Sequence, residues 1–168
     1  HIYGKNVGYT NETNDSDINT LSDKKHKTHY WMYTVFDDKS WNECQQKGIM
    51  VLGMDDIGDY SQFASKEALR QELIDVYDSS TSRKNQALMA WNFANTVSVN
   101  DVIFAKRSNT LVGKGIVTGN YVFDDLRQEY KNVHAVKWLQ VGEWEHPGNA
   151  VAKRLTAVSY THLTLPTT

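Results

Sequence analysis

The hydrophobic pattern changes its period half-way along this chain, and the change limits the folds open to it. In the first half, apolar residues such as Leu69, Leu73 and Val76 recur at helical spacing, whereas later ones form short runs typical of strands. Helices are expected over residues 40–47, 65–77 and 84–95, and strands over residues 29–36, 49–52, 101–105, 110–118 and 133–141. A strand followed by helices and then by strands predicts an α+β domain.

Glycines inside the later strands indicate that the sheet is small and strongly curved. Gly113 and Gly115 interrupt residues 110–118, and glycine within a strand marks a bulge or a sharp coil. Ser108–Asn109 separates two apolar runs and predicts a hairpin turn. The expected fold class is therefore α+β, built on a compact curved sheet or small barrel.

Polar residues next to the predicted helices indicate where those helices start and stop. Asp38 or Ser40 is expected to cap the first helix, and Gly48 takes the left-handed position that ends it. Ser65 is expected to open the second helix, with Glu67 in the first turn where the helix dipole favours an acid.

Both ends of the chain lack the pattern of a packed domain. Residues 1–28 are interpreted as a polar linker, because only Ile18 and Leu21 are aliphatic between residues 10 and 28. The string from Val158 to Thr168 resembles translated sequencing-adapter read-through. We expect residues 149–168 to be a non-native or disordered tail, with the natural protein continuing into a further domain. Residues 29–148 have the size of one domain.

Composition excludes several classes of function. The chain has 18 Lys and Arg against 20 Asp and Glu, a formal net charge of -2, so bulk electrostatics cannot hold it on nucleic acid. Its single Cys excludes an internal disulfide and favours a reducing compartment. No apolar run approaches the roughly 18 residues that span a bilayer, and the start lacks a signal-peptide pattern. We expect a cytoplasmic protein without a membrane partner or cofactor.

The residues with catalytic or metal-binding chemistry do not form a recognisable motif. The common nucleophile, phosphate-loop and zinc motifs are absent from the sequence. His26 and His29 stand beside lysines, where a solvated basic stretch is the better interpretation. Glu129–Lys131 has the Glu-x-Lys spacing of a metal-dependent nuclease, but Asp124 and Asp125 lie too close to come from a separate strand. We interpret this segment as a charged loop and expect no catalytic and no metal site.

Aromatic residues beside polar, kinked segments are the feature that suggests a ligand. Trp41 follows a polar helix start, and three carboxylates and Tyr60 follow the apolar run at residues 49–52. Flat rings beside hydrogen-bond acceptors suit a planar polar ligand, such as a nucleobase turned out of its stack. Core packing is the alternative, above all for Trp31 and Trp138 on apolar strands.

Several stretches match a known group of domains in the same order along the chain. They are Tyr30–Trp31, Trp41, residues 47–60, 90–93, 99–105, 113–117 with Tyr121, and 136–138 leading to 142–144. On these residues the chain resembles the N-terminal specificity domains of McrB-type modification-dependent restriction proteins. These domains belong to the EVE and PUA-like group, which is related to the YTH readers of methylated adenine in RNA. The resemblance implies a small curved β-barrel with flanking helices. It also implies a pocket where aromatic side chains enclose a flipped, usually methylated base.

Two positions depart from the pattern of these domains. Met54 stands where Trp often follows the glycine, and Asn100 stands where Gly is usual before Asp101. The first departure removes one ring from the expected cage, although a Met side chain can pack a methyl group against a ring.

The resemblance implies a DNA-binding specificity domain that recognises a modified base and is not itself an enzyme. The residues expected to bind the base are Trp31, Trp41, Met54, Asp55, Asp56, Asp59, Trp91 and Phe93. The residues expected to bind phosphates are Lys39, Lys106, Arg107 and Lys114. For the aspartates a role in turns is an equal alternative, and for the cations a solvated surface position is.

The implied partners are those of a modification-dependent restriction system. They are DNA carrying a modified base, a C-terminal AAA+ GTPase motor domain and a nuclease subunit. Two other functions remain open from the sequence: a protein-interaction module, and a reader of modified bases in RNA.

Overall fold

The computed structural model describes residues 27–78, 80–145 and 155–158. The strands are β1 (Tyr30–Thr34), β2 (Ile49–Leu52), β3 (Val102–Arg107), β4 (Thr110–Val117), β5 (Val122–Phe123), β6 (Asn132–Glu145) and β7 (Leu155–Ala157). The helices are α2 (Asp38–Lys47), α3 (Lys66–Val76) and α4 (Lys84–Asn95), with short 3-10 helices η1 (Asp55–Ile57) and η2 (Tyr60–Gln62).

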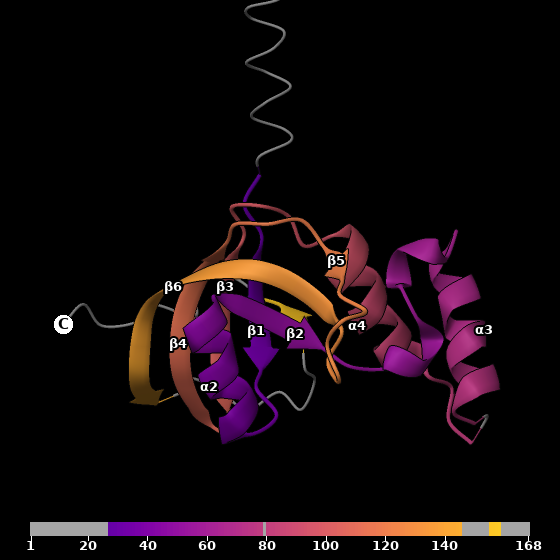
Figure 1. The fold of residues 1–168 in the computed structure, drawn as a ribbon, viewed down its shortest axis with the longest axis horizontal. Helices are drawn as coiled ribbons and strands as arrows, with labels where there is room; N and C mark the ends of the chain where they lie inside the picture. Colours follow the sequence, from indigo (N-terminus) through magenta and orange to yellow (C-terminus); the bar gives the residue numbers. More distant parts are fainter. Residues whose placement is uncertain (1–26, 79, 146–154, 159–168) are drawn as a thin grey trace, which may run out of the picture.

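The strands form one curled, open sheet with helices against it (Figure 1). Its order is β2-β6-β4-β3-β1-β7, and β5 pairs with β6 outside this path. Figure 1 shows α3 and α4 side by side at one end of the sheet and α2 packed against its curve. The expected α+β fold with a small curved sheet and flanking helices is confirmed, and it is consistent with a PUA-like domain.

Local sequence signals set the helix ends. Asp37 caps α2, because its carboxylate accepts a hydrogen bond from the Ser40 N–H at 2.7 Å. The prediction of a cap at Asp38 or Ser40 is therefore wrong. Gly48 ends the helix at φ 66°, as predicted. Ser65 caps α3 through the Ala68 N–H at 3.1 Å, also as predicted.

Glycines allow the sheet to bend, as the sequence indicated. β3 and β4 form the predicted hairpin. The register of β4 on β6 shifts next to Gly113 and again between Lys114 and Gly115. A Cβ atom on Gly115 would lie 2.8 Å from Cε3 of Trp138, so this close approach of two strands requires glycine.

The folded domain extends beyond the predicted boundary at residue 148. Strand β7 lies within the expected tail and pairs antiparallel with β1, where Leu155 faces Tyr33. Leu155 is buried and belongs to the main core, so its apolar surface explains why this segment joins the sheet. The expectation of a tail without structure is therefore wrong for residues 155–157. The rest of the predicted tail, apart from Val158, and nearly all of the predicted linker lie outside the described residues.

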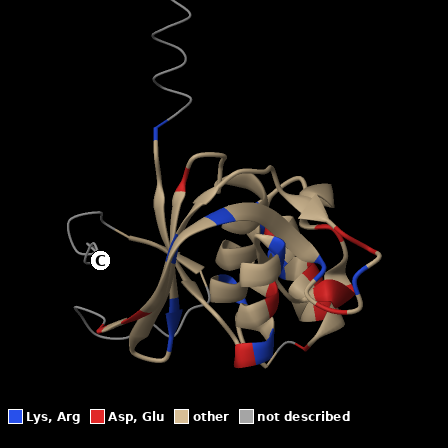
Figure 2. Cartoon of the chain, turned by 60° about the vertical axis from the view of Figure 1, so that its left-hand side comes forward, with Lys and Arg blue, Asp and Glu red and all other residues tan. Residues whose placement is uncertain are grey.

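Acidic and basic residues are both spread over the molecule. Figure 2 shows acidic and basic positions next to one another at several places on the cartoon. Among the described helices, none is long and apolar enough to cross a membrane.

Candidate functional site

A pocket of about 250 Å³ lies where β2 ends. Three elements far apart in the sequence line it: the end of β2, helix α4, and the loop that precedes β6. The lining residues are Leu52, Gly53, Met54, Gln86, Met89 and Tyr130. The volume falls below the roughly 300–1,000 Å³ typical of drug-sized ligand sites, so the pocket suits one small ring system.

Two lining residues have unusual backbone conformations. Met54 has φ 59° and Tyr130 has φ 51°, and both are non-glycine residues in the left-handed region. Such conformations cost about 1–3 kcal/mol each and persist where the surrounding structure fixes them, often at ligand sites. A Cβ atom on Gly53 would lie 3.5 Å from Cδ1 of Tyr130, so the Tyr130 ring lies directly against the Gly53 backbone.

A buried hydrogen-bond network holds the β2 end of the pocket. The Asn132 side-chain amide donates to the carbonyls of Leu52 at 3.2 Å and Gly53 at 3.1 Å. The Tyr121 hydroxyl donates to the Asn132 Oδ1 at 2.6 Å and accepts from the Tyr60 N–H at 2.9 Å. The Tyr60 hydroxyl also donates to the Gly53 carbonyl. This network fixes the backbone that forms one wall of the pocket.

The chemistry of the lining suits a flat ligand that is largely apolar. Met54 and Met89 supply polarisable thioethers, and Tyr130 supplies an aromatic face. Gln86 is the lining residue with a side-chain amide. Its Oε1 accepts a hydrogen bond from Arg83 Nη1 at 2.8 Å, and its NH2 group can act as a donor. A ring stacked on Tyr130 with one hydrogen-bond acceptor on its edge matches these groups.

A larger groove of about 880 Å³ lies on the other side of Tyr130, between α2 and the loop at residues 124–130. Its charged side chains carry both signs, so the groove has no net positive charge. The basic ones are Lys39, Lys47 and Arg127, and the acidic ones are Asp37, Glu43, Asp124 and Glu129. The Glu129–Lys131 segment is part of this loop, as the sequence predicted.

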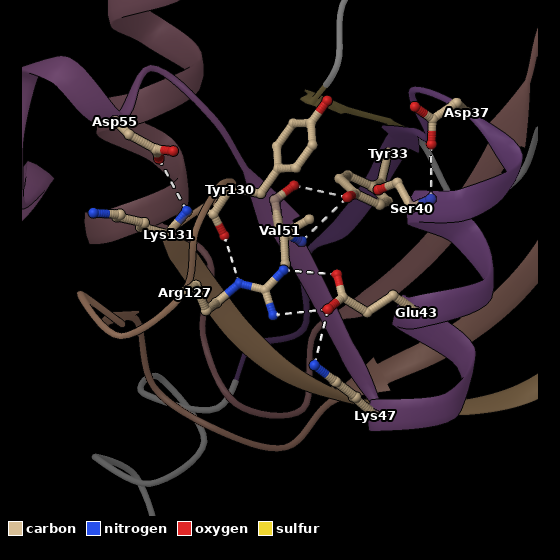
Figure 3. Close-up of polar contacts among 10 residues, drawn as sticks. All are labelled: Tyr33, Asp37, Ser40, Glu43, Lys47, Val51, Asp55, Arg127, Tyr130 and Lys131. Atoms are coloured by element: carbon tan, nitrogen blue, oxygen red, sulfur yellow. Dashed lines mark hydrogen bonds and ion pairs between the residues drawn. The ribbon is translucent and has the colours of Figure 1, made fainter.

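An ion pair crosses the groove (Figure 3). The Arg127 guanidinium makes two hydrogen bonds to the Glu43 carboxylate, at 2.7 and 3.2 Å, and Lys47 Nζ lies 2.9 Å from the same carboxylate. Hydrogen bonds from Arg127 and then from Lys47 lower the pKa of Glu43 to about 2.

The predicted aromatic residues do not form a shared cage. Trp31 is 2% exposed, and its indole N–H donates to Asp101 at 2.9 Å. Trp41 is 4% exposed and packs edge-on against Trp138, with ring centroids 4.9 Å apart. Trp91 packs half-buried against the main core. No ring contact among the described residues joins these three indoles, and none of them lines either pocket described above.

Phe93 and Met54 end in different surroundings. Phe93 is fully buried and packs edge-on against His134, with ring centroids 4.8 Å apart, so it belongs to the core. Met54 lines the small pocket, and it is the expected base-binding residue that the structure places there.

The three aspartates lie beside the pocket without lining it. Asp55 accepts from the backbone N–H of Lys131 at 2.9 Å, and Asp56 is exposed. Burial favours the neutral form of Asp59, but hydrogen bonds from the N–H and hydroxyl of Ser61 outweigh it and lower the pKa of Asp59. Asp55 and Asp59 thus order the chain after β2, the turn-forming alternative given above.

The four predicted phosphate-binding cations have different surroundings. Lys39 lines the groove, whereas Lys106 is 2% exposed and its Nζ donates to the Ser108 carbonyl at 3.3 Å. The Lys106 side chain is thus buried at the end of β3, and its expected phosphate contact stays a prediction. Arg107 pairs with Asp38 at 2.6 Å, and Lys114 Nζ lies 5.9 Å from the centre of the Phe104 ring.

Comparison with known proteins shows the family. The model of the family described as "Domain of unknown function (DUF8426)" matches residues 30–164. This chain belongs to that family. Among curated proteins, none matches the sequence.

Solved structures with a similar chain path to this DUF8426 domain include YTH domains. The YTH domain of Zygosaccharomyces rouxii MRB1 protein, in complex with N6-methyladenosine RNA, has 9% identity and a TM-score of 0.47, covering 81% of this chain and 82% of that one. The Mmi1 YTH domain has 9% identity and a TM-score of 0.47, covering 82% and 83%. The Pho92 YTH domain in complex with m6A has 12% identity and a TM-score of 0.39, covering 71% and 63%.

Most residues that line the small pocket of this DUF8426 domain have no distinctive signal in the sequence. Gln86 and Met89 lie on a helix whose periodicity also fits plain core packing. Tyr130 lies in a segment whose charges dominate its pattern. One usable signal was present in the sequence: the aromatic residue Tyr130 lies just before the predicted strand at residues 133–141.

Proposed function

We propose that this domain binds a nucleic acid strand by taking one modified base into the pocket formed by Met54, Met89 and Tyr130. The observation that carries the proposal is the pocket itself, which has one aromatic wall, two thioethers and one amide donor in about 250 Å³. Stacking on the Tyr130 ring would contribute about 1–3 kcal/mol, as base–aromatic stacks do. Burial of one added methyl group contributes about 0.8 kcal/mol more.

The pocket replaces the cage of indoles that the sequence predicted. Trp31, Trp41 and Phe93 stabilise the fold, and the ligand-facing surface comes from Met54 and from residues outside the predicted set. A thioether adapts to the shape of a ring better than an indole does, which supports a tolerant fit around a methyl group.

We propose that the nucleic acid strand that carries the modified base is DNA. We also propose that the domain is a specificity module without enzymatic activity. The support is the sequence resemblance to McrB-type specificity domains, together with the pocket. The same resemblance supports a cytoplasmic modification-dependent restriction system, in which an AAA+ GTPase motor and a nuclease subunit act on the bound DNA.

Paired oligonucleotides test the proposal. Fluorescence anisotropy would compare DNA strands with one N6-methyladenine, one 5-methylcytosine or no modification, and matching RNA strands. We expect one modified DNA to bind about fourfold more tightly than its unmodified partner, the factor to which about 0.8 kcal/mol corresponds. Tyr130→Ala should weaken binding of the modified DNA about 5- to 150-fold. Leu139→Ala is the matched control, because Leu139 is exposed on β6 and lines neither pocket.

Three outcomes would change the assignment. Equal binding of modified and unmodified strands would refute modified-base recognition. Tighter binding of the modified RNA than of the modified DNA would assign the domain to RNA. No binding to any strand would favour the protein-interaction alternative.

A further inference from the structure

One peptide unit beside the pocket is held at both of its polar ends. The carbonyl of Tyr130 accepts a hydrogen bond from Arg127 Nε at 2.9 Å. The N–H of the same peptide unit, which belongs to Lys131, donates to Asp55 Oδ1 at 2.9 Å. Figure 3 shows Arg127 and Asp55 on opposite sides of this unit.

Arg127 is itself fixed by helix α2. Its two terminal nitrogens bond to the two oxygens of Glu43, while its Nε faces the Tyr130 carbonyl. The planar guanidinium thus joins the pocket loop to α2 through three N–H groups in one fixed arrangement. The side chain of Arg127 is only 12% exposed, so water competes weakly for these bonds.

We infer that Arg127, Glu43 and Asp55 are positioning residues for the Tyr130 ring. Fixing the peptide plane between residues 130 and 131 restricts the ψ angle of Tyr130, whose φ of 51° lies in the left-handed region that an L-residue otherwise leaves readily. This conformation keeps the ring against the Gly53 backbone, where it forms the wall of the pocket. The consequence for ligand binding rests on the proposed function, whereas the consequence for the loop does not.

Lysine cannot replace Arg127 in this arrangement. A single ammonium group can pair with Glu43, but it cannot present a separate donor to the Tyr130 carbonyl from the same planar fork. Lys47 provides the matched control, because it bonds to the same Glu43 oxygen as Arg127 but has no described bond to the pocket loop.

Hydrogen exchange on the free domain tests the loop, and anisotropy tests the pocket. We expect Arg127→Lys and Asp55→Ala each to raise the exchange rates of the amides at residues 124–131 by about tenfold or more, with Lys47→Ala within about twofold. We expect the same two variants to weaken binding of the modified oligonucleotide about tenfold, while binding of the unmodified strand changes less. Thermal unfolding would confirm that each variant remains folded.

The results separate the two proposals. Unchanged exchange in Arg127→Lys and Asp55→Ala would overturn the positioning role, whatever the ligand does. Faster exchange with unchanged affinity for the modified strand would also overturn it, because the position of the Tyr130 ring would then not depend on Arg127 and Asp55. If the unaltered domain binds no oligonucleotide, the proposed function fails, and the exchange rates still decide whether these residues fix the loop.

Discussion

Replacing Asn132 with alanine tests whether the buried network supports the pocket wall. The side chain is 0% exposed, and its three close hydrogen bonds to Leu52, Gly53 and Tyr121 lie between 2.6 and 3.2 Å. Asn132→Ala removes all three and leaves the Tyr121 hydroxyl proton without its acceptor.

The structure sets the size of the effect. Each buried hydrogen bond contributes about 1 kcal/mol net, and a buried donor left without an acceptor costs about 1–3 kcal/mol. We therefore expect the free energy of unfolding to fall by about 3–5 kcal/mol. Tyr121→Phe keeps the ring and removes only the hydroxyl, so it should cost about 2 kcal/mol, one for each of its two bonds.

Urea unfolding of the two single variants and the double variant measures these energies. Because Asn132 and Tyr121 share a bond, the double variant should lose about 1 kcal/mol less than the sum of the two single losses. A loss below about 1 kcal/mol for Asn132→Ala, or strict additivity in the double variant, would refute a network that holds the β2 end.

Further perturbations test other parts of the fold. Gly113→Ala should cost about 1–3 kcal/mol by urea unfolding, because its Cβ would lie 2.8 Å from Cη2 of the buried Trp41, while the exposed Thr118→Ala should cost under about 0.5 kcal/mol. Glu43 has a folded pKa near 2, below its unfolded value, so its ion pair stabilises the domain above about pH 4.5 and this contribution is lost as pH falls toward 2. Unfolding at pH 7 and at pH 3 should therefore show a smaller acid loss for Glu43→Gln than for the unaltered domain. Burial lowers the pKa of Lys106 in the folded domain. The unfolded chain therefore binds more protons than the folded domain near that pKa, so the free energy of unfolding rises with pH there. Lys106→Met should remove this rise, which urea unfolding between pH 7 and pH 10 would measure. Oligonucleotide affinity should depend only weakly on salt, since the chain carries a formal net charge of -2, and a steep loss of affinity between 50 and 200 mM salt would contradict that.

Local structure followed from residues that are neighbours in the chain. Gly48 and Ser65 set helix ends because the groups they satisfy lie within four residues of them. The hairpin of β3 and β4 followed in the same way from its turn and from two adjacent apolar runs. Such signals arise from hydrogen bonds between residues that are close in the chain, so they can be recognised from the sequence alone.

The choice between core and ligand-facing aromatics depended on the tertiary structure. Trp31 is buried because β1 pairs in parallel with β3, which brings Asp101 to its indole from 70 positions away. Tyr130 is a pocket wall because Arg127 reaches Glu43 across 84 positions. Neither contact has a periodic or local signature in the sequence.

The amino-acid sequence by itself determined helices α2, α3 and α4, the described strands other than β5 and β7, and where glycine permits the sheet to bend. The tertiary structure decided which rings are buried and which face a ligand. The physical reason is that an apolar run specifies that a face must be covered, whereas the residues that cover it are set by strand order and register.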